Sequence, residues 1–76
     1  MYLLDRISNK TDGTLKKSVY EYESIDEAKG NTYVYFGTDI KDATVLSVNC
    51  LLHETNGNIL ENLYWQKSDF AEVETE

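Results

Sequence analysis

The chain has 76 residues, and its 14 acidic and seven basic side chains give it a formal net charge of −7. A domain of this size buries only about 60 % of the surface that its unfolded chain exposes, so we expect modest stability that oligomerisation would raise. The single cysteine, Cys50, excludes an internal disulfide and a cysteine-based zinc framework, and the excess of acids disfavours direct nucleic-acid binding.

The apolar runs of the sequence, such as Tyr33 to Phe36, are far too short to span a bilayer. The opening residues MYLLDRISNK lack both a basic region ahead of their apolar stretch and a small-residue cleavage site, so no signal peptide is expected. These features predict a cytoplasmic protein that makes no membrane contact.

The segment TDGT, residues 11–14, is the first strong turn signal, because a type I′ turn needs positive φ at both central residues. A two-residue turn at Asp12 and Gly13 predicts a hairpin whose faces carry two different sets of side chains. Leu3, Ile7, Tyr20 and Tyr22 would share one face, and Tyr2, Leu4 and Val19 the other. Neither face is cleanly polar, so the register stays open.

The stretch SIDEAKGNTYVYFGTDIKD, residues 24–42, begins with a capping box, in which Ser24 accepts from the amide of Glu27. A helix therefore starts at Ile25. Helical spacing as far as Lys41 would place Ile25, Lys29, Thr32, Tyr33, Phe36 and Ile40 on one side. Alternatively, Gly30 ends the helix and TYVYF forms a fifth strand, which its residue propensities favour.

The segment TNGN, residues 55–58, predicts a second hairpin, centred on Asn56 and Gly57. This turn pairs Cys50 with Leu63 and Val48 with Trp65, which we expect to anchor the core. The predicted core face carries Leu46, Val48, Cys50, Leu52, Ile59, Leu63 and Trp65, with Glu61 as the one interruption. Asn49, His53, Asn62, Tyr64 and Gln66 would face outward.

An ordered series of short segments runs through residues 2–67: TDGT, a strand ending in YEYES, then DEAK, a run to IKD, a hydrophobic strand, NGN and a closing YW. In this series the chain resembles a family of small acidic proteins of phages and prophages from Gram-positive bacteria. The resemblance implies one continuous helix after DEA. The family has no established function, so it assigns no functional residues.

We therefore predict a single α+β domain over residues 1–67, in which two β-hairpins flank one helix of residues 25 to about 41. The order is β-β-α-β-β, and the helix packs on one face of an antiparallel sheet. Residues 68–76 contain four acids and no base, and we expect this tail to fray.

The candidate site residues point to protein contact rather than to catalysis or metal binding. Acidic side chains around the end of the first hairpin and an outward-facing tyrosine predict a partner-binding surface: Glu21, Glu23, Asp26, Glu27 and Tyr64. His53 and Cys50 fall on opposite faces of one strand, so they cannot share a metal ion or form a nucleophile and base pair. We expect neither a cofactor nor enzyme activity.

A helix strip away from the core carries Gly30, Val34 and Gly37. Each glycine costs about 1 kcal/mol relative to alanine in a helix. Close approach of a second copy would explain that cost, so the strip predicts a homodimer interface. Exposed sheet edges offer a second route to pairing, because no proline blocks them.

These features favour a non-enzymatic, phage-encoded interaction protein in the cytoplasm of a bacterial host. It would inhibit or modulate a host factor, such as a component of antiviral defence or a basic nucleic-acid-binding protein, through an acidic and aromatic surface. One alternative is an oligomer that binds a nucleotide signal between its subunits. Another is an accessory protein of phage structure or assembly.

Overall fold

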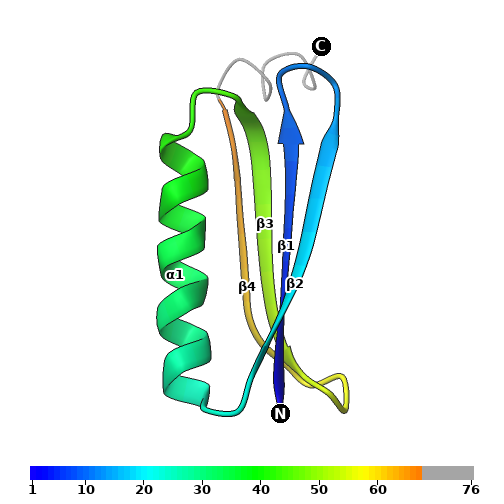
Figure 1. Cartoon of the computed structure of the whole chain (residues 1–76), viewed down its shortest axis with the longest axis vertical. Helices are drawn as coiled ribbons and strands as arrows, with labels where there is room; N and C mark the ends of the chain where they lie inside the picture. The colour runs from blue at the N-terminus through cyan, green and yellow to red at the C-terminus, as the bar shows by residue number, and fades with distance from the viewer. Residues whose placement is uncertain (68–76) are drawn as a thin grey trace.

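The computed structural model describes residues 1–67 and arranges them in the predicted order β-β-α-β-β. The elements are β1 (Tyr2–Lys10), β2 (Leu15–Tyr22), α1 (Ile25–Lys41), β3 (Val45–Glu54) and β4 (Ile59–Gln66). All four strands form one antiparallel sheet in the order β2-β1-β3-β4, and α1 lies along one face of it (Figure 1). The fold class is thereby confirmed. The expectation of a frayed tail over residues 68–76 lies outside the described residues.

Helix α1 begins where its capping residue predicts and continues through both of its glycines. The Ser24 hydroxyl accepts from the amide of Glu27 at 3.4 Å, and the helix runs without interruption to Lys41. The segment TYVYF is therefore helical rather than a fifth strand. No helix within residues 1–67 has the length and apolar character needed to cross a membrane.

The buried side of α1 agrees only in part with the predicted one. It is centred on Ala28, Thr32 and Asp39, whereas Lys29 and Tyr33 are exposed. The small side chain of Ala28 allows the helix to approach the sheet, and the Thr32 hydroxyl donates to the Ala28 carbonyl at 2.7 Å. The prediction was correct for Thr32, Phe36 and Ile40, which are buried or pack against the core, and wrong for Lys29 and Tyr33. It missed Ala28, which is small, and Asp39, a polar residue whose carboxylate is hydrogen-bonded inside the protomer.

The turn of the first hairpin contains one residue more than predicted, and this reverses the predicted faces. The Lys10 amide donates to Thr14 O at 2.8 Å and the Gly13 amide to Lys10 O at 3.0 Å, so the loop is residues 11–13, with Gly13 at φ 89°. This is a type I turn followed by a left-handed glycine. A shift of one residue moves side chains to the other face, and Tyr2 and Leu4 consequently lie beside Tyr22 and Tyr20.

The second hairpin keeps the predicted register along most of its length, since Val48 pairs with Trp65 and Cys50 with Leu63. Its loop also has one residue more than predicted, but an irregularity in β4 beyond Leu52 compensates for the shift. Ile59 is consequently opposite His53 and 59 % exposed, so its predicted core position was wrong.

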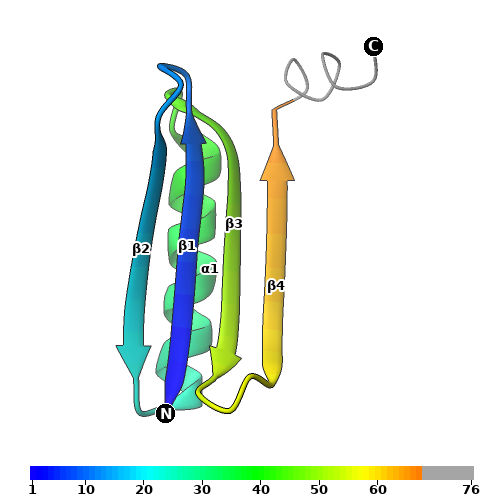
Figure 2. The same ribbon diagram turned by 90° about the vertical axis from the view of Figure 1, so that its right-hand side faces the viewer.

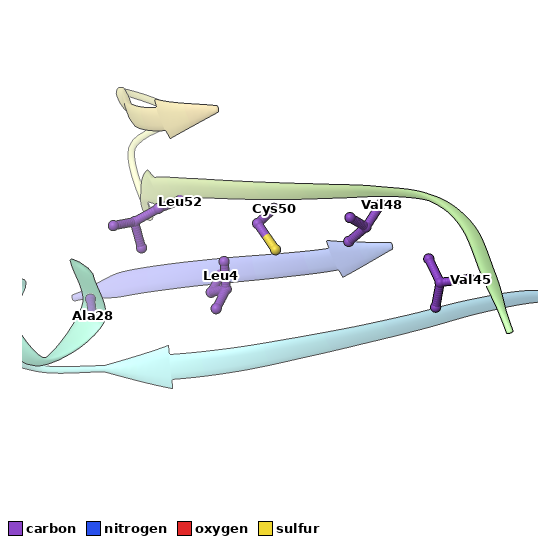
Figure 3. Packing of buried hydrophobic residues seen from close by; sticks show 6 residues of the cluster. All are labelled: Leu4, Ala28, Val45, Val48, Cys50 and Leu52. Carbon is purple, nitrogen blue, oxygen red and sulfur yellow. The ribbon is translucent and has the colours of Figure 1, made fainter. Parts of the chain in front are cut away.

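The hydrophobic core lies between α1 and the two central strands. Figure 3 shows its fully buried members, which are Leu4, Ala28, Val45, Val48, Cys50 and Leu52. A register shift between β1 and β3 after Asn9 places Val45 in this cluster, where Leu46 was predicted. Trp65 packs against the cluster but is not among its fully buried members. Burial raises the pKa of the Cys50 thiol to about 11, so this side chain is a protonated filler at neutral pH.

The two kinds of glycine in this fold predict opposite effects of alanine. A Cβ at Gly30, inside the helix, would meet nothing within 4 Å, so Gly30→Ala is expected to raise the free energy of unfolding by about 1 kcal/mol. Gly57 has φ 95° in a hairpin loop, a conformation that is strained for alanine. Gly57→Ala is therefore expected to lower the free energy of unfolding by about 1 kcal/mol. Urea unfolding of both variants tests these two predictions. Equal effects would contradict the helical conformation of Gly30 or the positive φ of Gly57.

Candidate functional site

Helix α1 covers one face of the sheet and leaves the other uncovered (Figure 1), and we call this second face the open face. Strand alternation places Leu3, Asp5 and Ile7 of β1 on this side, opposite the buried Leu4. The strand pairing places on the same side the residues of β2, β3 and β4 that lie opposite these positions. The apolar members of the open face are Leu3, Ile7, Leu15, Val19, Leu51, Ile59 and Tyr64. Of these, Leu15, Val19, Ile59 and Tyr64 are each more than half exposed.

Polar side chains between these apolar residues pair with one another. The His53 Nε2 atom lies 3.3 Å from Asp5 Oδ2, and the two residues belong to the two central strands of the sheet. Nearby, the Asn49 amide nitrogen donates to Asn62 Oδ1 at 2.8 Å. The polar groups are thus largely satisfied within the protomer, and the apolar side chains between them are the unpartnered part of this face.

The predicted acidic residues gather at one end of the molecule. Glu21 lies near the end of β2, Glu23 follows this strand, and Asp26 and Glu27 belong to the first turn of α1. All four are exposed. The fifth predicted partner-binding residue lies elsewhere. Tyr64 is on β4, at the opposite edge of the sheet from β2, where it belongs to the open face.

Most basic residues lie toward the other end of the long axis of the molecule, which extends over 40 Å. The Thr11 amide donates to Thr44 O at 2.8 Å, which joins the β1–β2 loop to the segment that follows α1. Lysines flank these two loops and the end of β4: Lys10, Lys16, Lys17, Lys41 and Lys67. The open face therefore extends from an acidic end to an end that is rich in lysine.

Arg6 and Asp39 form an ion pair between β1 and α1 that the sequence analysis missed. The Arg6 guanidinium donates from Nε to Asp39 Oδ2 at 2.8 Å and from Nη2 to Oδ1 at 2.6 Å. It also lies 4.5 Å from the ring centroid of Tyr35, which stacks on Tyr20. The hydrogen bond to Asp39 raises the pKa of Arg6 above its ordinary value. A signal was present, because Arg6 occupies a core-facing position between Leu4 and Ser8, and a charge there needs a partner.

A small cavity adjoins this ion pair, with a volume of about 80 Å³. Ligand pockets for molecules of nucleotide size measure about 300 to 1,000 Å³, so this cavity is too small to hold a nucleotide. Its lining mixes cations, hydroxyl groups and carboxylates: Arg6, Ser8, Lys10, Lys16, Ser18, Thr38, Asp39 and Asp42. Lys10 already lies 3.6 Å from Asp42. The ion pair between Arg6 and Asp39 therefore serves chiefly to attach α1 to the sheet.

The predicted oligomer strip lies on the outer side of α1. Val34 is 61 % exposed, and a Cβ at Gly30 or Gly37 would meet nothing within 4 Å in the protomer. Packing inside the protomer thus requires neither glycine. As predicted, Cys50 and His53 lie on opposite faces of β3. Separately, residues 1–67 contain no group of three or more metal-ligating side chains placed to hold an ion.

No protein family model, curated protein or solved structure matches the chain.

Proposed function

We propose that this chain is a non-enzymatic interaction protein that docks its open face on a basic, partly apolar protein surface and thereby modulates a host factor. The observation that carries the proposal is the apolar set on the open face, in which Leu15, Val19, Ile59 and Tyr64 are each more than half exposed. Leu15 and Val19 lie on the β2 edge and Ile59 and Tyr64 on the β4 edge, and the partly buried Leu3, Ile7 and Leu51 lie between these edges. Apolar side chains thus extend across the whole face, interleaved with polar ones, and exposed apolar surface of this extent favours a protein interaction site.

The distribution of charge supports the choice of a basic partner. Glu21 lies on the open face itself, next to Leu3, and the exposed acids Glu23, Asp26 and Glu27 continue from its strand. The net charge of −7 would steer the protein toward a positive surface. Apolar contact across the open face and charge attraction at the acidic end then act together. The resemblance to phage proteins is the reason for expecting a host protein as the partner.

Affinity capture from a lysate of a Gram-positive bacterium tests this proposal with the variant Leu51→Glu. Leu51 lies at the centre of the open face, where a glutamate would be desolvated against the apolar part of the partner surface. We expect the parent to retain one basic protein whose binding weakens with added salt. Leu51→Glu should retain at most about one tenth as much.

Val34→Glu is the matched control, since it adds the same charge on the exposed side of α1. It should retain as much partner as the parent does. Purified partner and circular dichroism of each variant then separate lost binding from lost folding. Retention of the same protein by Leu51→Glu, or capture of no specific basic protein by the parent, would refute docking through the open face.

A further inference from the structure

The two edges of the sheet differ in their protection against pairing with another strand. The β2 edge, LKKSVYEY, carries Lys16, Lys17 and Glu21, and charged side chains are a usual device against edge pairing. The β4 edge, ILENLYWQ, carries a single charge, Glu61, and no proline. In the described part of the chain β4 pairs only with β3. The unprotected edge is therefore β4.

Helix α1 leaves β4 incompletely covered. Figure 2 shows α1 behind β1, between β2 and β3, with β4 outside the outline of the helix. Leu63 and Trp65 point toward the helix layer but remain only partly buried. An added strand beside β4 would cover more of both side chains, and it would satisfy the unpaired backbone groups of the edge.

Backbone hydrogen bonding shows which residues of β4 could pair outward. The Lys67 amide donates to Leu46 O, toward β3, at 2.9 Å. In an antiparallel ladder the backbone groups alternate in direction, so those of Leu63 and Trp65 also point toward β3. The alternate residues of β4 turn their backbone amides and carbonyls toward the free edge. These residues are Asn62, Tyr64 and Gln66.

The segment from Glu61 to Lys67, ENLYWQK, is complementary to itself about Tyr64. If two copies pair antiparallel with Tyr64 opposite Tyr64, each side chain meets a suitable partner. The pairs are Glu61 with Lys67, Asn62 with Gln66, Leu63 with Trp65, and Tyr64 with its own copy. In this register the backbone amides and carbonyls of Asn62, Tyr64 and Gln66 form the hydrogen bonds between the two copies. Both helices lie on the same side of the joined sheet.

We propose that the protein forms a two-fold homodimer through antiparallel pairing of β4 with β4, centred on Tyr64. Within the protomer, Glu61 Oε1 accepts from the Tyr33 hydroxyl at 3.1 Å and Lys67 Nζ donates to Ala43 O at 2.9 Å. These bonds leave Glu61 Oε2 and two hydrogens of the Lys67 ammonium group for pairing between copies. Charge complementarity between Glu61 and the partner's Lys67 selects a second copy as the occupant, because the same strand supplies both halves of the match. The two sheets become one sheet of eight strands, and the two open faces become continuous. The dimer needs no other partner, so its test is independent of the proposed function.

Sedimentation of the purified protein at high micromolar concentration tests the interface with Asn62→Pro. The Asn62 backbone amide points to the free edge, so proline there removes no backbone bond to β3 but blocks the added strand. It does remove the side-chain bond from Asn49, whose amide nitrogen keeps its second acceptor, Leu63 O, at 2.9 Å. We expect a dimeric parent and a monomeric Asn62→Pro variant. Lys17→Pro is the matched control: the bond from the Lys10 amide to Thr14 O turns the Lys17 amide outward at the β2 edge. This variant should remain a dimer.

A charge exchange tests the register even if the proline variant fails to fold. Lys67→Glu places a glutamate opposite Glu61 at two symmetric positions, and we expect it to raise the dimer dissociation constant at least about tenfold. Glu61→Lys should do the same, and the double variant Glu61→Lys/Lys67→Glu should restore the dimer. A monomeric parent, a folded dimeric Asn62→Pro, or a double variant no tighter than the single ones would overturn the proposal. So would a dimer that only Val34→Glu splits, since its interface would be the Gly30, Val34 and Gly37 strip.

Discussion

Leu52→Ala is expected to lower the free energy of unfolding by about 2 to 5 kcal/mol. Leu52 has no exposed surface and points from the central strand β3 into the cluster that contains Leu4 and Ala28 (Figure 3). Truncation removes its apolar contacts and leaves a cavity that strands on both sides prevent from closing. A domain of this length has a total stability of about 4 to 11 kcal/mol, so the loss is a large part of the whole. Urea unfolding measures it.

Leu51→Ala is the matched control, because it makes the same change one residue earlier in the same strand. Leu51 lies on the open face and is only partly buried, so its truncation is expected to cost about 1 kcal/mol. Equal losses at the two positions would show that the open face is as well covered as the core, which would contradict both the placement of α1 and the proposed docking surface.

Loss of one partner of the Arg6–Asp39 ion pair is expected to cost about 3 to 5 kcal/mol. The Asp39 side chain is only 6 % exposed and that of Arg6 19 %. Arg6→Met would leave the Asp39 carboxylate buried without its two guanidinium hydrogen bonds. Asp39→Leu would leave the guanidinium with only Tyr20 and the Tyr35 ring. Both single variants should therefore unfold at clearly lower urea concentrations than the parent.

The double variant Arg6→Met/Asp39→Leu should recover most of this loss, because it removes both charges and fills the space with apolar atoms. A double-mutant cycle from the four unfolding curves measures the coupling between the two side chains. If the costs of the single variants simply add in the double variant, the two groups do not stabilise each other and the proposed attachment of α1 by this pair is wrong.

Local chemistry was sufficient to predict the start of the helix and the positions of both turns, whereas the continuation of the helix through TYVYF was predicted only from the family resemblance. Ser24 and Glu27 mark the start of α1 by a hydrogen bond that depends only on nearby residues. Gly13 and Gly57 mark the turns, since both adopt a positive φ. Loop length was harder to predict, because the same glycine serves a two-residue or a three-residue loop. One residue then decides which face each side chain of the strand occupies.

Features that depend on distant parts of the chain were not predicted. The irregularity after Leu52 that restores the register of β4, and the shift that buries Val45, arise where strands meet across the sheet. Arg6 and Asp39 are 33 residues apart, and neither neighbourhood identifies the other. The acidic end was found from its charges, whereas the apolar open face appeared only once the first hairpin had its correct register.

The position of β1 has a consequence for how the chain folds. This first strand lies inside the sheet, between β2 and β3 (Figure 2). A nascent chain can form the β1–β2 hairpin and α1 early, but the second edge of β1 stays unpaired until residues 45–54 have been synthesised. Closure of this long loop is the costly step. During synthesis, β1 is therefore the strand most exposed to incorrect pairing, and deletion of residues 2–10 would leave β2 and β3 without the strand that joins them.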